Sequence, residues 1–152
     1  MHAEPKKVFI DTNILLAATN QDRPEHAQCT AILEAMMSDA HTGYVNGQVL
    51  REYAVVATRP KVQNGLDLSP EAAADNIDTF RSILFILEET RSVADEPVRL
   101  IRTHELHGKR IHDANIAATV IAHGLSELLT SNPKDYAPFP EITCTRPKEF
   151  MI

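Results

Sequence analysis

Residues 7–13 read KVFIDTN, a short apolar run that stops at an aspartate and continues into helix-forming sequence. Lys7–Ile10 is typical of a buried strand, and Thr12–Ala18 of the helix that follows it. The rest of the chain repeats this order, with further short strand-like segments at 42–45, 84–87, 127–130 and 142–144. Such alternation predicts an α/β fold whose parallel sheet is covered on both faces. Ligands bind beyond the carboxyl ends of such strands, which is where Asp11 lies.

The helices are predicted from apolar spacing, capping residues and helix breakers. Ser69 as cap and Pro70 at the first position predict a helix start. The preceding helix is expected to end before Pro60, because a residue that precedes proline disfavours the helical conformation. Gly124 provides a helix stop. The expected helices after the first are 25–38 (opened by Pro24, with Ala27, Ala31 and Ala35 as apolar positions and Ile32 beside them), 48–58, 70–82, 96–106 and 110–123.

Length and charge limit the classes of protein. The 152 residues suit one domain, 1–152, and the net charge of −6 argues against gripping nucleic acid by bulk charge. An acidic metal site in a nuclease remains compatible with that charge. Cys29 and Cys144 lack metal-type spacing, so free thiols in a reducing cytosol are expected, with a disulfide left open. We expect no signal peptide or membrane span, and a cytoplasmic protein.

Two carboxylates have both a structural and a functional interpretation. Asp11 stands between a strand and a helix, where aspartate often caps the helix. Glu52 falls at the edge of an apolar helical stripe, so its charge must be paired, protonated, bound to a metal or able to reach water. An ion pair of Glu52 with Arg51, Arg59 or another basic residue is the plain alternative to a functional role.

Asp113 is the clearest candidate for a functional carboxylate. It lies on the apolar arc of its helix, whereas the polar arc runs through His112, Asn115, Thr119 and His123. Its place in the first helical turn also suits a cap or a partner of the helix dipole. A carboxylate inside an apolar face is nevertheless costly. If these acidic residues converge they repel one another, and Mg²⁺ or Mn²⁺ with oxygen ligands would remove that penalty and support phosphodiester hydrolysis.

Four segments together resemble the motifs of the PIN-domain family, most closely the VapC-type toxins. Each is weak alone, but their order and spacing agree across nearly the whole chain. They are Ile10–Asn13, Gln48–Tyr53, Gly108–Ala118 and Thr130–Tyr136. The resemblance implies a PIN-like three-layer α/β/α sandwich with a central, mainly parallel sheet. It also implies metal-dependent cleavage of RNA, a cognate antitoxin protein and a homodimer.

The resemblance also assigns roles to the matching residues. Asp11 and Asp113 would be the metal ligands, and Glu52 would complete the catalytic set directly or through water. Asn132 stands where many PIN domains carry aspartate, and Asp135 lies nearby, which leaves a second metal open. Thr12, Asn13 and Thr130 would support the carboxylates, with a plain helix start or strand end as the alternative. Arg51, Lys109, Arg110 and Lys134 are candidate contacts to RNA phosphates or simply solvated side chains.

Other functions remain open from the sequence. A catalytically weak or inactive PIN-like scaffold that binds RNA or protein is the main alternative, and Asn132 motivates it. Another kind of α/β enzyme is the third, although the chain has no glycine-rich phosphate loop, Gly-x-Ser-x-Gly elbow or zinc spacing. His104 and His107 are read as a solvated face. Neither the RNA target nor the antitoxin is identified by the sequence.

Overall fold

A computed structural model describes residues 4–152 and places five strands in one parallel sheet, in the order β3-β2-β1-β4-β5. The strands are β1 (Lys7–Ile10), β2 (Thr42–Asn46), β3 (Phe85–Leu87), β4 (Glu127–Leu129) and β5 (Thr143–Thr145). In the central strand, Phe9 pairs with Tyr44 of β2 on one side and with Leu128 of β4 on the other. The five strand-like segments of the sequence are thus confirmed, with the last at one edge.

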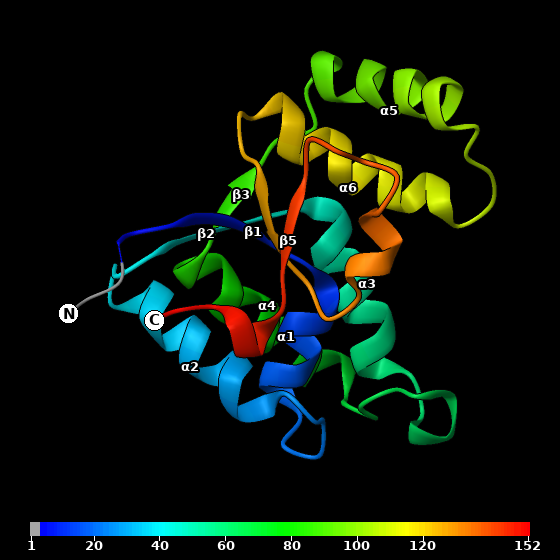
Figure 1. Ribbon diagram of the computed structural model, residues 1–152. Helices are drawn as coiled ribbons and strands as arrows, with labels where there is room; N and C mark the ends of the chain where they lie inside the picture. Colours follow the sequence, from blue (N-terminus) through cyan, green and yellow to red (C-terminus); the bar gives the residue numbers. More distant parts are fainter. Residues whose placement is uncertain (1–3) are drawn as a thin grey trace.

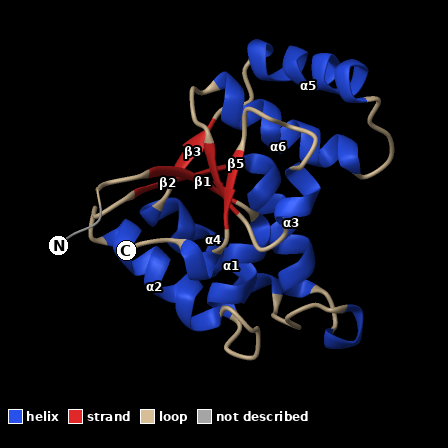
Figure 2. Ribbon diagram, viewed as in Figure 1, coloured by secondary structure: helices blue, strands red, loops and turns tan. Residues whose placement is uncertain are grey.

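Helices cover both faces of the sheet (Figures 1 and 2). Helices α5 and α6 lie on one face, and α1, α2 and α4 lie on the other, with α3 packed against α1 and α4. The predicted three-layer α/β/α architecture is confirmed. The helices are α1 (Thr12–Thr19), α2 (His26–Met37), α3 (Gly47–Thr58), α4 (Pro70–Ile83), α5 (Arg91–His104) and α6 (Arg110–Ala122), with 3-10 turns η1 (Lys61–Gln63), η2 (Pro133–Tyr136) and η3 (Pro147–Glu149).

Helix α5 departs most from the sequence prediction, because it begins at Arg91 and not at residue 96. The Thr90 side chain caps it by accepting a hydrogen bond from the amide of Val93 at 3.4 Å. Pro97 therefore lies inside the helix, where it removes one backbone hydrogen bond. Burial of Val93 and Leu100 in a helix packed along α6 offsets that loss, which is a tertiary effect that local sequence does not reveal.

Two predicted helix faces are also corrected. In α2 the predicted apolar positions Ile32 and Ala35 are buried, but Ala27 is exposed, and Leu33 and Met36 are buried as well. In α6, Thr119 was placed on the polar, outward arc, but it is fully buried. Its hydroxyl accepts a hydrogen bond from Asn46 Nδ2 at 3.1 Å. The polar side chain of Thr119 can therefore be buried, because Asn46 of β2 forms a hydrogen bond with it.

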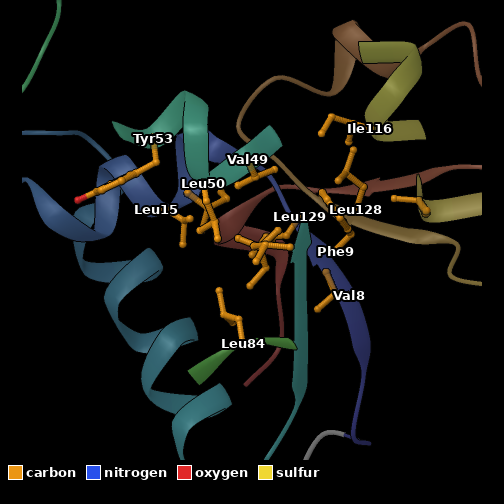
Figure 3. Close-up of a cluster of buried hydrophobic side chains, with 14 of the residues drawn as sticks. Val8, Phe9, Leu15, Val49, Leu50, Tyr53, Leu84, Ile116, Leu128 and Leu129 are labelled. Atoms are coloured by element: carbon orange, nitrogen blue, oxygen red, sulfur yellow. The ribbon is translucent and has the colours of Figure 1, made fainter. Parts of the chain in front are cut away.

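The core lies on both sides of the sheet (Figure 3). Phe9 and Leu128 are neighbours in register and face Ile116 of α6. On the other side Gly43 of β2 leaves room for close packing, since a Cβ there would lie 2.7 Å from Leu84 Cδ2 and 2.9 Å from Ile10 Cδ1. This tight packing holds the carboxyl ends of the strands, and the loops after them, in fixed positions.

Two further sequence expectations concern the chain as a whole. Among residues 4–152, no helix has the length and apolar character needed to cross a membrane. Cys29 is buried, Cys144 is half-buried, and both are unpaired, so the disulfide that the sequence left open is not formed.

Candidate active site

The candidate site lies at the point where the strand order changes direction. Chain connections run from the central β1 toward β2 on one side, whereas β4 lies on the other. A crevice at such a switch point is the usual ligand site of a parallel α/β sheet. Asp11 follows β1 there, and its backbone amide donates to Leu129 O of β4 at 3.0 Å. Thr130 directly follows Leu129, so the first and last motifs of the sequence meet.

Asp11 is nearly buried and receives four hydrogen bonds. The amide of Thr12 donates to Oδ1 at 2.8 Å, which makes Asp11 the cap of α1. Its Oδ2 accepts from Thr130 Oγ1 at 2.9 Å, Tyr136 OH at 3.2 Å and Asn13 Nδ2 at 3.3 Å. Burial raises the pKa of Asp11, and the bonds from Thr130, the Thr12 amide and Tyr136 oppose that rise by stabilising the anion. Asp11 is therefore both a helix cap and a rigidly oriented carboxyl group.

Glu52 projects from α3 and forms a hydrogen bond with Thr12, the residue after Asp11. Thr12 Oγ1 donates to Glu52 Oε2 at 3.0 Å, while the Thr12 amide binds Asp11. Gln48, one turn earlier on α3, donates through Nε2 to Glu52 Oε1 at 2.8 Å. Among residues 4–152, Glu52 forms no ion pair with Arg51 or Arg59, so the alternative raised from sequence does not account for its position.

Asp113 lies in the first turn of α6 and is partly buried. Its pKa is raised to about 6, first by burial and then by the negative charges of Asp135, Asp11 and Glu52, while Lys109 opposes the rise. The three predicted catalytic carboxylates therefore lie near enough to act on one another. Within the described chain no hydrogen bond to the Asp113 carboxyl group is present, which leaves both of its oxygens available.

The closing segment supplies both support and charge. Thr130 is fully buried, and its hydroxyl is saturated: it donates to Asp11 and accepts from Asn13 Nδ2 at 3.3 Å and from the Asn132 amide at 3.1 Å. The Asn132 side chain is exposed and makes no hydrogen bond within residues 4–152. Asp135 is exposed and lies near enough to raise the pKa of Asp113. Of the two uncertain positions, Asp135 therefore contributes negative charge and Asn132 does not.

The four predicted RNA-contact residues are all exposed. Within the described residues none of them is in an ion pair, so their charges are available. Of the four, Lys109 lies near enough to Asp113 to lower the pKa of that carboxyl group. These residues are Arg51, Lys109, Arg110 and Lys134. A further cation, Arg146, was not identified from sequence; its guanidinium donates to Ser131 O at 3.2 Å, beside Thr130.

Three other supporting residues were not recognised as such from sequence. Asn46 caps α3 through its Oδ1, which accepts from the Val49 amide at 3.0 Å, and it binds Thr119 of α6. Gln48 orients Glu52, and Tyr136, at the end of the closing motif, reaches Asp11 through its hydroxyl. Asn46 was detectable in principle, because a polar residue ends β2 as Asp11 ends β1. Gln48 was also detectable in principle, because it lies one helical turn before Glu52, whereas the contact between Tyr136 and Asp11 joins distant segments and leaves no local signal.

The donor set suits a hard divalent cation bound by few protein ligands. Among residues 4–152, no three His, Cys, Asp or Glu side chains are grouped so as to hold a metal ion by themselves. Mg²⁺ commonly uses one or two carboxylates and completes its shell with water and phosphate oxygens. Asp113 has both oxygens free, and Asp11 Oδ1 accepts only the Thr12 amide. Asp11 and Asp113 thus fit as direct ligands, and Glu52 would complete the set directly or through water.

Comparison with known proteins agrees with this geometry. The family model described as "PIN domain" matches residues 8–138, which contain every predicted catalytic and supporting residue. The chain belongs to the PIN-domain family. Among PIN-domain relatives, a protein named Ribonuclease VapC24 from Mycobacterium tuberculosis is 33% identical over 131 residues, covering 86% of this chain and 89% of the relative. Ribonuclease VapC48 from the same organism is 26% identical over 139 residues, covering 90% and 94%.

Solved PIN-domain structures share the fold at lower identity. VapBC2 from Rickettsia felis, bound to a DNA fragment from its promoter, matches with a TM-score of 0.68 and 21% identity over 92% of this chain and 98% of that one. Mycobacterium tuberculosis VapC20, described as a sarcin–ricin loop cleaving toxin, matches with a TM-score of 0.66 and 14% identity over 87% and 95%. At these identities the structures support the PIN-domain fold alone.

Proposed function

We propose that this PIN-domain protein is a metal-dependent endoribonuclease and the toxin of a toxin–antitoxin pair. The observation that carries the proposal is the meeting of Asp11, Glu52 and Asp113 at the switch point of the sheet, where their charges raise the pKa of Asp113. The ribonuclease names of the VapC relatives support RNA as the substrate. Mg²⁺ is the proposed cofactor, with Mn²⁺ as a substitute, because all the candidate ligands are oxygens.

The protein's own residues orient the acidic groups and the RNA. Asp11 is held by four donors, and Glu52 is fixed from two sides by Thr12 and Gln48. Asp113 offers its free oxygens to the cation. A divalent cation bound there would place positive charge against the scissile phosphate and acidify water. The exposed cations named above would hold neighbouring phosphates, which positions the strand without reading its sequence.

The partners follow from the same family relation. A cognate antitoxin is proposed because several solved neighbours, from Rickettsia felis, Klebsiella pneumoniae and Salmonella typhimurium, are described as VapBC or toxin–antitoxin assemblies. A homodimer in the cytoplasm is also proposed. Phe85 and Ile86 of the edge strand β3 are 63% and 41% exposed, and Met37 is 63% exposed, so apolar surface is available for such contacts.

Cleavage of a mixed cellular RNA pool by the purified, antitoxin-free protein tests the proposal. We expect cutting with Mg²⁺ or Mn²⁺, none with a chelator, and a loss of at least about 100-fold in Asp113→Asn, as is common when a group that acts on transition-state charge is removed. Asp95→Asn, which alters an exposed carboxylate on α5, is the matched control and should cut like the parent. If folded parent protein cuts no RNA, or if Asp113→Asn cuts equally well, the non-catalytic scaffold becomes the better explanation.

A further inference from the structure

A pocket of about 390 Å³ adjoins the acidic site between α3, the start of α6 and the middle of α5. Its volume lies within the range of small-ligand sites, about 300–1,000 Å³. Arg51 and Glu52 line it and also line a second pocket with Thr12, so they form the wall nearest to the catalytic carboxylates. His112, which also lines the pocket, is the residue before Asp113. A group bound in this pocket would therefore lie directly beside the scissile phosphate.

The lining suits a flat polar ring and disfavours a phosphate. Pro97 and Ile111 contribute apolar surface, and Ile111 is 40% exposed although it is aliphatic. Glu52 and Glu89 bring two carboxylates against the single guanidinium of Arg51, so the pocket would repel an anion. Apolar surfaces with a few convergent polar groups are typical of sites for small heterocycles, and single-stranded RNA is read through such splayed-out bases.

Apart from Arg51 and His112, the polar side chains of the pocket offer a ligand chiefly acceptors. Asn115 Nδ2 donates to Gln48 Oε1 and, at 3.3 Å, to Glu89 Oε1. Gln48 Nε2 is in turn occupied by Glu52 and by His112 O at 3.3 Å. These bonds use up the amide donors of Asn115 and Gln48. Within residues 4–152, Asn115 Oδ1 and Glu89 Oε2 accept no hydrogen bond, so both remain available to a ligand that donates.

We propose that this pocket binds a base of the RNA next to the scissile phosphate and favours bases that carry an exocyclic amino group. Adenine, cytosine and guanine carry such a group, whereas uracil presents a carbonyl oxygen at the corresponding edge and would face Glu89 as an acceptor. The proposal rests on the ribonuclease function and extends it to base preference. The Asn115–Gln48–Glu52 chain further links the occupied pocket to a catalytic carboxylate.

Cytidine and uridine are a matched pair of probes, because their bases differ at the amino or carbonyl group. Each nucleoside is titrated into ¹³C-methyl-labelled parent protein without metal, and the NMR signals of Ile111 are followed. We expect cytidine to bind about tenfold more tightly than uridine, as one hydrogen bond to a charged acceptor allows. Glu89→Gln, an exposed and isosteric change that turns an acceptor into a donor, should bring this ratio close to one. Val98→Ala, on α5 outside the pocket, should leave it unchanged.

A second arm sequences the RNA ends that the parent protein and Glu89→Gln produce from a random-sequence pool. One position beside the cut should be depleted of uracil in the parent, and this depletion should be lost in Glu89→Gln. Equal binding of both nucleosides, no binding of cytidine, or an unchanged ratio in Glu89→Gln would overturn the pocket assignment. Absence of RNA cleavage with cytidine preference retained would instead overturn the ribonuclease function, since the nucleoside arm needs no catalysis.

Discussion

Asp113 is the residue at which burial and like charge act in the same direction. Its pKa of about 6 lies above the ordinary value of 3.8, so the folded protein holds this proton more tightly than the unfolded chain does. Between these two values the folded state binds more protons, and its stability from this group falls as the pH rises. Above about pH 6 the ionised carboxylate therefore destabilises the metal-free fold.

Asp113→Asn should stabilise the metal-free protein at pH 7.5. The shift corresponds to about 3 kcal/mol at most, and partial solvent exposure reduces the expected gain to about 1–2 kcal/mol, or about 3–6 °C in Tm. At pH 4 the parent carboxyl group is mostly protonated when folded, so the difference should become small. Thermal unfolding in chelator at both pH values measures this. Asp95→Asn should show no such pH-dependent gain, and a less stable Asp113→Asn at pH 7.5 would contradict the account.

Helices α3 and α6 carry Glu52 and Asp113, and buried polar contacts fix one helix against the other. Asn46 caps α3 and donates to Thr119 of α6, while Gln48 of α3 meets Asn115 of α6. Apolar packing alone permits small sliding of helices, whereas a satisfied buried hydrogen bond specifies one arrangement. The register of the two helices, and so the spacing of their carboxylates, depends on these amides.

Asn46→Ala should be more destabilising than loss of an ordinary cap. It removes the cap of α3 and also the donor to the buried Thr119 hydroxyl, so we expect a loss of about 2–3 kcal/mol, or about 5–10 °C in Tm. Ser69→Ala is the matched control, because Ser69 caps α4 at an exposed site by accepting from the Ala72 amide at 3.1 Å. It should cost about 1 kcal/mol. If Asn46→Ala and Ser69→Ala lose the same stability in thermal or urea unfolding, the Asn46–Thr119 hydrogen bond contributes nothing to the stability of the fold.

At the scale of the whole molecule, the fold concentrates negative charge at the carboxyl ends of the central strands. Asp11, Glu52, Asp113 and Asp135 come from four separate segments and meet only because β1 and β4 are adjacent. Because the net charge of the chain is −6, no general excess of positive charge offsets the repulsion among these carboxylates. A divalent cation would relieve it, so binding should couple directly to folding stability.

Mg²⁺ should therefore raise the Tm of the parent protein and not that of Asp113→Asn. At a Mg²⁺ concentration of about ten times Kd the gain is about 1.4 kcal/mol, or about 3–5 °C. Differential scanning fluorimetry with and without Mg²⁺ at constant ionic strength measures it. Asp95→Asn should respond like the parent. An equal Mg²⁺ response in Asp113→Asn would remove that residue from the proposed metal ligands.

The sequence by itself determined the parallel α/β architecture and the placement of Asp11, Glu52 and Asp113 in three separate motifs. These features are local: strand and helix periods, capping residues and the cost of a carboxylate on an apolar face can each be read within one segment. The order of the motifs then sufficed for the PIN-domain resemblance. The same local reasoning missed the first turn of α5, which begins at Arg91 and not at residue 96.

Only the tertiary structure decided the remaining contacts around those carboxylates, beyond the ones from Thr12, Asn13 and Thr130 that the motifs predicted. Tyr136 reaches Asp11 across 125 positions of sequence, and Asn115 reaches Gln48 across 67. Thr119 is buried, although it was expected on the polar arc of its helix, because Asn46 comes from another strand to meet it. Such contacts depend on how packed layers bring distant segments together, and no period or cap within a segment records them.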